Sequence, residues 1–233
     1  AIEESPLELP PLPAFEGWVL RREDFAEGRV GGKSMNVKRL VGALPPWVEL
    51  PSAVALPFGC FEQTLTAPQN AAAAERYREL ESKLERRSLQ SGLAELKACV
   101  ESLEAPAGLE QELQGAIDAA GLPWPGDFAR SFACIKKVWA SKWNERATLS
   151  REARRIPHER LAMAVLVQEI MPAELAFVLH TVNPLTGDPK ELYGEVVVGL
   201  GETLVGNYPG RAMGFVAAKS GATPPRVIAY PSK

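Results

Sequence analysis

The segment Val30-Gly31-Gly32-Lys33-Ser34-Met35-Asn36 sets two glycines and a lysine at the start of a stretch that we expect to form a short helix through Val41. Glycine lets the backbone approach an anion closely. The free amide groups of a helix N-terminus can then hold phosphate oxygens together with a lysine. The glycine spacing before Lys33 is not that of a P-loop. Taken alone, the segment is better explained as a surface turn with a solvated lysine.

The regions on either side of this segment differ in character. Residues 1–16 combine four prolines with acidic residues, which excludes a regular helix, and we interpret them as a linker from an upstream domain. On the other side, a short apolar run at Ala53–Leu56 lies between Pro51 and Pro57. This run predicts a strand that is buried beside the first helix.

Residues 70–150 predict a series of helices. Their apolar residues recur at intervals of three and four, and Pro106 and the stretch 121–126 break the series into separate helices. Trp139 and Trp143 have helical spacing and apolar neighbours, so we expect them to pack in the core rather than to stack on a sugar. The apolar stripes are Tyr77, Leu80 and Leu84; Leu89, Leu93, Leu96, Val100 and Leu103; and Leu109, Leu113 and Ile117.

After Pro157 the pattern changes to short runs rich in Val, Leu and Ile, separated by turn-forming residues. A helical first part followed by a mostly β second part predicts an α+β fold. We expect two packed subdomains, at residues 17–156 and 157–233. The predicted strands are Met163–Glu169, Leu175–Val182, Leu192–Val198, Phe215–Ala218 and Val227–Tyr230.

Polar residues follow two of these apolar runs. Gln168 and Glu169 end the first run, and a buried strand with a polar end can present side chains to a purine edge or a ribose. An ordinary strand whose end meets water explains this pattern better when it is taken alone. The loop 199–206 contains three glycines, which favours unusual backbone angles or close approach to a ligand. Glu195 and Glu202 could face a cation or hydroxyl there, and a tight structural turn is an equal alternative.

The histidines and cysteines do not indicate a catalytic centre. His180 lies within an apolar strand and His158 in an arginine-rich connection, where we expect it to be exposed, and we assign neither a catalytic role. The three cysteines are widely spaced and form no C-x-x-C pair, which argues against a zinc site or disulfide framework. We expect Cys60, Cys99 and Cys134 to be reduced residues of the core.

The length, hydrophobic content and net charge of the chain indicate which partners to expect. The chain has 233 residues, of which 46% are hydrophobic, enough for a sizeable core. Its formal net charge of -3 gives no basic footprint for nucleic acid or for an acidic membrane surface. No apolar run approaches the roughly 18 residues needed to cross a bilayer. We therefore expect neither nucleic acid nor a membrane among the partners.

Four segments, in order along the chain, resemble signatures of the dikinases, a family that includes pyruvate, phosphate dikinase and phosphoenolpyruvate synthase. The opening lysine segment is the first of them. Four signatures in sequence are far more specific than any one of them alone. They are Gly31–Asn36; Val138–Ser141 with Glu145–Ala147; Met163–Glu169; and Gly199–Val205.

Further segments are similar to one branch, the α-glucan, water dikinases, which phosphorylate starch. The likeness runs from about Phe25 to Lys233. In other branches an Arg-Ser motif followed by Glu-Asp lies between the first and second signatures, and residues 61–130 contain none. In the α-glucan branch that motif follows a Tyr-Pro-Ser-Lys segment, with which this sequence ends at Lys233. The similar segments are Trp47–Pro51, Ala55–Gly59, Trp124–Asp127, Ser141–Ala147 and Gly206–Ala212.

This resemblance implies an ATP-grasp-like nucleotide-binding fold, incomplete at its C-terminus, with ATP and Mg²⁺ held between two subdomains. It implies that Lys33 binds ATP phosphates and Gln168 the adenine side, with Glu169 and Glu202 as further nucleotide contacts. The resemblance specifies no metal ligands and no catalytic residue in this segment. Positioning and charge neutralisation are what phosphoryl transfer needs most.

For the complete enzyme, the resemblance implies transfer of the β-phosphate of ATP to a histidine and then to a glucosyl residue of starch. The γ-phosphate goes to water. The histidine belongs to an upstream domain that has no counterpart here, so we expect the segment alone to be inactive. The family also implies a plastid location, in the chloroplast for example, and contact with starch through other domains.

Two other functions stay open on the sequence. One is a non-catalytic helical interaction domain that keeps the fold without the chemistry. The other is the nucleotide-binding domain of a pyruvate-type dikinase, which would be accompanied by a barrel domain for an enolate substrate.

Overall fold

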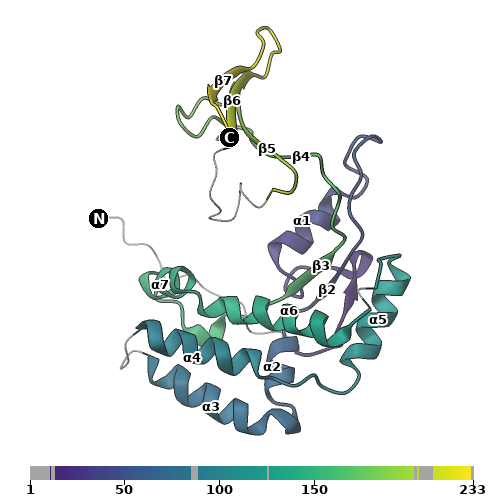
Figure 1. Ribbon diagram of the computed structural model, residues 1–233, viewed down its shortest axis with the longest axis vertical. Helices are drawn as coiled ribbons and strands as arrows, with labels where there is room; N and C mark the ends of the chain where they lie inside the picture. The colour runs from purple at the N-terminus through teal and green to yellow at the C-terminus, as the bar shows by residue number, and fades with distance from the viewer. Residues whose placement is uncertain are drawn as a thin grey trace. The chain divides into compact units, whose positions relative to one another are not determined.

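The computed structural model describes residues 11, 14–84, 89–124, 126–201, 204 and 212–231. The chain divides into two compact units, of which unit 1 runs from Ala1 to Glu169 and unit 2 from Ile170 to Lys233 (Figure 1). Both helices and strands occur, so the predicted α+β class is confirmed. In the part of the chain that the structure describes, no helix is long and apolar enough to cross a membrane.

Unit 1 is organised around a three-stranded antiparallel sheet in the order β1-β2-β3. Its strands are β1 (Leu20–Arg21), β2 (Ala53–Leu56) and β3 (Val165–Gln168). The central strand β2 is buried throughout its length because both faces of the sheet are covered. In its register with β3, Ala53 pairs with Gln168 and Leu56 with Val165.

Most helices of unit 1 pack into the larger of two hydrophobic cores, and the three apolar stripes that the sequence predicts pack there. Leu96, Val100, Leu109 and Leu113 are at most 1% exposed. Val54 and Leu56 turn into this core from one face of the sheet. The contributing helices are α2 (Cys60–Leu65), α3 (Ala71–Ser82), α4 (Leu89–Glu101), α5 (Leu109–Ala119) and α6 (Phe128–Ala140), with the short helix η4 (Ser141–Trp143). The helix α7 (Glu145–Ala153) and the turn η5 (His158–Arg160) follow.

Aromatic rings hold the middle of this core. Trp139 and Trp143 are 1% and 0% exposed, which confirms that they pack inside. The ring of Phe61 lies 5.7 Å from those of Tyr77 and Trp139, and Tyr77 lies 5.9 Å from Trp143. These tilted and edge-on contacts each add roughly 0.5–1.5 kcal/mol beyond burial of the ring area.

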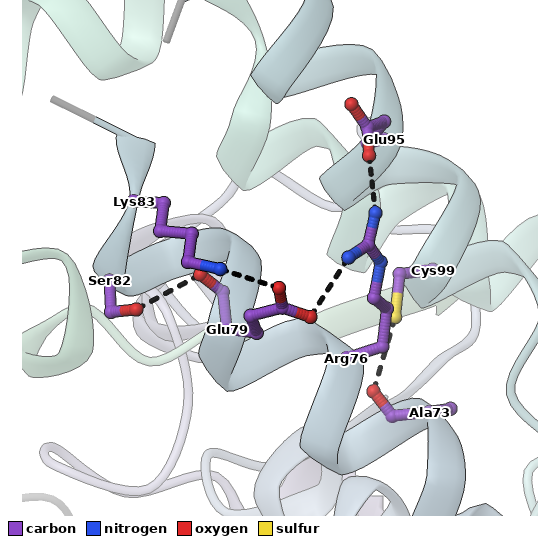
Figure 2. Close-up of polar contacts among 7 residues, drawn as sticks. All are labelled: Ala73, Arg76, Glu79, Ser82, Lys83, Glu95 and Cys99. Carbon is purple, nitrogen blue, oxygen red and sulfur yellow. Dashed lines mark hydrogen bonds and ion pairs between the residues drawn. The ribbon is translucent and has the colours of Figure 1, made fainter. Parts of the chain in front are cut away.

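Ion pairs link charged residues on the outer surfaces of α3 and α4 (Figure 2). Arg76 bridges Glu79 at 2.9 Å and Glu95 at 2.7 Å, and Lys83 also contacts Glu79 at 2.6 Å. The hydrogen bonds from Lys83 and Arg76 lower the pKa of Glu79 to about 2. Because these groups face water, the network is a modest surface tie and not a site.

A smaller core lies on the opposite face of the sheet. It consists of Phe25, Val30 and Ala55, with Leu166 and Met35 packed against them. Met35 belongs to α1 (Gly32–Leu40), which therefore covers this second face, and η1 (Arg22–Asp24) leads into the connection before it. Figure 1 draws α1 in purple beside β3.

Unit 2 is a four-stranded antiparallel sheet in the order β4-β5-β6-β7. A β-bulge lies between Gly214 and Phe215. The strands confirm four of the predicted runs, with ends that shift by a few residues. They are β4 (Leu175–His180), β5 (Glu191–Val198), β6 (Met213–Ala218) and β7 (Arg226–Ala229).

Three expectations need correction. The compact units meet after Glu169 and not at 156/157, because β3 pairs with β2 and so belongs to unit 1. Cys60 is buried, but Cys99 is only partly buried and Cys134 is exposed, so the cysteines are free thiols without all being core residues. His158 is partly buried and not exposed, because it packs against the ring of Trp143. The predicted linker lies largely outside the described residues.

Candidate functional site

The N-terminus of α1 carries a set of free donors. Gly31 is the N-cap residue with an extended backbone, and its carbonyl accepts the first helical hydrogen bond from the amide of Met35 at 3.1 Å. The amides of residues 32–34 have no partner within the helix, as at any helix N-terminus. No acidic residue occupies the first turn, and the side chain of Lys33 is exposed. The helix end therefore presents amides and an ammonium group without a competing carboxylate.

Gln168 lies on the face of the sheet that α1 covers. Leu166 packs in the small core beside Met35, and side chains two residues apart along a strand leave it on the same face. Gln168 is the last residue of β3 and is exposed, whereas Val167 turns into the larger core on the other face. The helix that carries Lys33 therefore covers the face of the sheet on which Gln168 lies, within one compact unit.

Glu169, the first of the two candidate glutamates, directly follows β3. The amide of Glu169 donates to the carbonyl of Ser52 at 3.1 Å, which extends the pairing of β2 and β3 by one residue. Glu169 is partly exposed, and alternation along the strand predicts the face opposite to Gln168 for its side chain. Glu202 lies outside the described residues, so the structure does not place it.

The glycine-rich loop has a structural reason for its first two glycines. Gly199 has a φ of 76°, and its amide donates to the carbonyl of Glu174 at 2.8 Å. A side chain at Gly201 would meet Cβ of Ala176 at 3.3 Å. In β5, the strand that precedes this loop, Glu195 accepts a hydrogen bond from the hydroxyl of Tyr193 at 3.2 Å. The described part of this loop therefore fits a tight turn in unit 2, and most of residues 202–211 are not described.

A second polar cluster, which sequence reasoning missed, surrounds Trp143 in unit 1. Lys142 and Arg151 are each 5% exposed, and their cationic groups lie 5.2 and 5.4 Å from the Trp143 ring. Arg151 donates from Nε to Nδ1 of His158 at 3.1 Å, and the His158 ring lies 5.2 Å from that of Trp143. No sequence signal marks the two buried cations, because their spacing resembles that of any solvated helix face.

Burial governs the titration of this cluster. It lowers the pKa of Lys142, and burial followed by the charge of Arg151 lowers the pKa of His158. Burial also raises the pKa of Glu81, which faces the cluster from α3. We interpret the cluster as a packing and electrostatic junction of α3, η4, α7 and η5, because its groups contact one another and the Trp143 ring.

The thiol of Cys60 is another buried group without a catalytic environment. Burial, followed by the charges of Glu112 and Glu62, raises its pKa well above the usual range. Its Sγ donates to the carbonyl of Trp18 at 3.4 Å. A thiol held in the protonated form is not a nucleophile, so Cys60 contributes packing.

Three open hollows in unit 1 lie away from α1. The largest, of about 790 Å³, lies between α3 and the segment 152–159, and a second, of about 640 Å³, lies beside Trp18 and α5. A third, of about 520 Å³, lies between α3 and α4. None of the three is lined by Lys33, Gln168 or Glu169. At α1 the exposed donors mark the candidate site.

No metal centre is formed by the described residues, among which no group of three or more His, Cys, Asp or Glu side chains is placed to hold an ion. The candidate site at α1 offers donors for an anion, with no acidic residue in the first turn of the helix.

Comparison with known proteins places these features in a family context. Residues 124–211, which include β3 and Gln168, match the model of the pyruvate phosphate dikinase AMP/ATP-binding domain. Over 221 residues, 93% of this chain, the sequence is 48% identical to "Alpha-glucan water dikinase, chloroplastic" of Citrus reticulata. It is 46% identical over the same length to the protein of that name from Solanum tuberosum. This chain resembles the alpha-glucan water dikinases.

The similarity covers only part of those proteins. The chain spans 15% of the length of each of the two alpha-glucan water dikinases. A "Probable phosphoenolpyruvate synthase" of Staphylothermus marinus is 43% identical over 72 residues, which is 31% of this chain and 9% of that protein. The likeness to alpha-glucan water dikinases thus extends through both units, whereas that to the synthase is confined to a minority of the residues.

Proposed function

We propose that this chain is the ATP-binding segment of a starch-phosphorylating dikinase. The observation that supports the proposal is that α1, which carries Lys33, covers the face of the sheet on which Gln168 lies, in a chain similar to dikinases. Phosphate oxygens and a purine both need hydrogen-bonding groups, and an ATP molecule presents the two at separate ends. Donors at a helix N-terminus and an exposed amide at a strand end suit these two ends.

Each residue of the site has a role in this proposal. The ammonium group of Lys33 and the amides of residues 32–34 hold phosphate oxygens, and the side-chain amide of Gln168 hydrogen-bonds the edge of the adenine. Glu169 and Glu202 serve as further nucleotide contacts. The fold is of the ATP-grasp kind, and Mg²⁺ accompanies the nucleotide.

When bound, Mg·ATP supplies the phosphoryl groups and their charge neutralisation. In the full-length protein, the β-phosphate passes to a histidine of an upstream domain and then to a glucosyl residue of starch, and the γ-phosphate passes to water. The residues of this segment bind and orient the nucleotide, and we expect the segment alone to be inactive. Starch binds to other domains of the full-length protein. The protein works in a plastid; the two relatives carry the word "chloroplastic" in their names.

An α-glucan is favoured over pyruvate as the acceptor because of the extent of the similarity. Identity to alpha-glucan water dikinases of 44–48% extends over 93% of the chain, and identity of 43% to a phosphoenolpyruvate synthase over 31%. Radiolabelled transfer from [β-³²P]ATP to soluble starch by the full-length protein tests this choice. Transfer to pyruvate instead would replace the proposal by that of a pyruvate-type dikinase.

Replacement of Lys33 tests the nucleotide site directly. We expect Lys33→Ala in the full-length protein to raise the Kd for Mg·ATP about tenfold to a hundredfold, because charge-assisted hydrogen bonds to phosphate contribute roughly 1.5–3 kcal/mol. Isothermal titration calorimetry measures the change. Lys137→Ala is the matched control, because Lys137 is exposed on α6, which packs on the opposite face of the sheet. Equal Kd values for Lys33→Ala and the wild type would remove Lys33 from the site.

A further inference from the structure

Lys38 lies in α1 and is directed at the segment that precedes the helix. Its Nζ donates hydrogen bonds to the carbonyl oxygens of Glu23 at 2.9 Å and Phe25 at 2.7 Å. These carbonyls belong to the end of η1, whose C-cap residue is Phe25. The ammonium group of Lys38 therefore joins α1 to the start of the segment that connects η1 with α1.

The connection between η1 and α1 is anchored at both ends. At its start, Phe25 is 0% exposed and packs with Val30 and Ala55 in the smaller core. Between the anchors, Gly28 turns the chain with a φ of 77°. At its end, Gly31 is the N-cap residue of α1. Lys38 lies in the last turn of α1, and its two bonds join this turn to the start of the connection.

The neighbouring cation, Arg39, also reaches this connection but holds it less firmly. It pairs with the carboxylate of Glu27 at 2.6 Å, and the two side chains are 60% and 76% exposed. Exposed ion pairs contribute little, because water competes for both partners. By contrast, the bond from Lys38 to Phe25 is partly buried, and loss of the ammonium group would leave two carbonyl oxygens without that donor.

We propose that Lys38 is a positioning residue for the phosphate-binding end of α1. The proposal rests on the proposed function, since it assumes that Lys33 and the amides of residues 32–34 hold phosphate. A binding constellation must be held to about 0.5 Å by groups behind it, and hydrogen bonds from a charged donor are among the strongest available. Lys38 supplies this support without touching the nucleotide.

The test is the Kd for Mg·ATP of full-length variants, measured by calorimetry at 20 °C alongside Tm. We expect Lys38→Met, which keeps the length of the side chain but no donor, to raise the Kd roughly fivefold to tenfold. Lys38→Arg restores the donors and should return the Kd to within about twofold of the wild type. Arg39→Met is the matched control and should leave the Kd unchanged.

A purely structural role for Lys38 would give a different pattern. Leu113→Ala lowers Tm through the larger core, on the other face of the sheet, and should not change the Kd. The positioning role is overturned if Leu113→Ala, at an equal loss of Tm, raises the Kd as much as Lys38→Met does. It is also overturned if Lys38→Met binds Mg·ATP with the Kd of the wild type. Should Lys38→Met fail to fold, Lys38→Gln, which keeps one donor group, is judged by the same two outcomes.

The same measurements separate this inference from the proposed function. An unchanged Kd in Lys33→Ala contradicts the nucleotide site itself, and Lys38 then has nothing to position. A raised Kd in Lys33→Ala with an unchanged Kd in Lys38→Met leaves the site intact and rejects the role of Lys38 alone.

Discussion

Arg155 adopts a backbone conformation that suits glycine. Its φ is 53°, and it follows the C-terminus of α7, where its amide donates to the carbonyl of Glu152 at 3.0 Å. The amide of Ile156 donates to the carbonyl of Arg151 at 2.9 Å. This pattern is a Schellman motif, in which the left-handed residue is most often glycine because a Cβ atom crowds the backbone there.

We expect Arg155→Gly to raise the free energy of unfolding by about 0.5–1 kcal/mol, because glycine relieves the crowding while adding some freedom to the unfolded chain. Urea denaturation followed by circular dichroism measures the change. Arg154→Gly is the control, since Arg154 has a φ of -97° and glycine there should lower stability. A stability gain in the control, or a loss in Arg155→Gly, would contradict this account.

Gly194 shows a second constraint at the level of one residue, in the middle of β5. A Cβ atom there would lie 2.3 Å from Cζ of Phe215 and 2.9 Å from Cδ2 of Leu179. The Phe215 ring therefore covers the glycine, and its neighbours leave no room for a methyl group. A glycine within a strand often marks such a close approach.

We expect Gly194→Ala to destabilise unit 2 by roughly 1–3 kcal/mol, the usual cost of overpacking. Amide hydrogen exchange measures the change: in the variant, exchange should be faster than in the wild type for residues 175–229 and unchanged in unit 1. Gly115→Ala is the control: Gly115 lies in α5 with nothing within 4 Å of the added atom, so this change should be neutral or stabilising. Wild-type exchange in Gly194→Ala would show that the ring can move aside at little cost.

At the scale of secondary-structure elements, the junction of α3, η4, α7 and η5 makes stability depend on pH. The pKa of His158 lies below its usual value because of burial and then the charge of Arg151. The charges of Lys142, Glu152 and Glu159 also face it. A histidine with a lowered pKa binds fewer protons in the folded state, so its contribution to stability is full above about pH 6.5 and is lost as the pH falls below that value.

We expect the free energy of unfolding of the wild type to fall between pH 8 and pH 5 by more than that of His158→Gln. Glutamine can still accept the hydrogen bond from Arg151 but does not titrate, so the difference between the two proteins isolates His158. Urea denaturation at several pH values provides the measurement. His180→Gln, at the exposed end of β4 in unit 2, is the control for a histidine change outside the junction. Parallel pH curves for His158→Gln and the wild type would refute the coupling.

Most elements were predictable because their signals are local. The apolar stripes of α4, α5 and α6 repeat every three or four residues, and the strands of unit 2 lie between turn-forming residues. The short β1 and the helix α2 were missed, since two residues of strand carry no periodicity and a helix of six residues is too short to show a repeating apolar stripe. Lys142 and Arg151 were missed for another reason: a charged residue at helical spacing predicts solvent exposure unless its neighbours are known.

At the scale of the whole molecule, the boundary between the units follows strand pairing and not the change of sequence texture after Pro157. β3 lies in the β-rich part of the sequence, yet it completes the sheet of unit 1 through its pairing with β2. Without β3, the side chains of Val165 and Val167 would be missing from the larger core. The segment 157–169 is thus part of the first folding unit.

We expect a fragment of residues 17–169 to unfold cooperatively, and a fragment of residues 17–156 to lack a cooperative transition. Removal of β3 strips one side of β2 of its hydrogen-bond partner and uncovers both hydrophobic cores. Thermal unfolding of the two fragments, followed by circular dichroism at 222 nm, distinguishes them. Equal cooperative melting of both fragments would place the boundary at residue 156 after all.

The sequence by itself determined the kinds of element, the buried stripe of each helix, and the dikinase likeness of the segment around Lys33, because each is written in neighbouring residues. Only the tertiary structure decided that Val165–Gln168 pairs with Ala53–Leu56, and that Gln168 therefore shares a face of the sheet with α1. The physical reason is the range of the interactions. Periodicity and capping act within a few residues, whereas the choice of a strand's partner depends on which distant surfaces bury the most apolar area together.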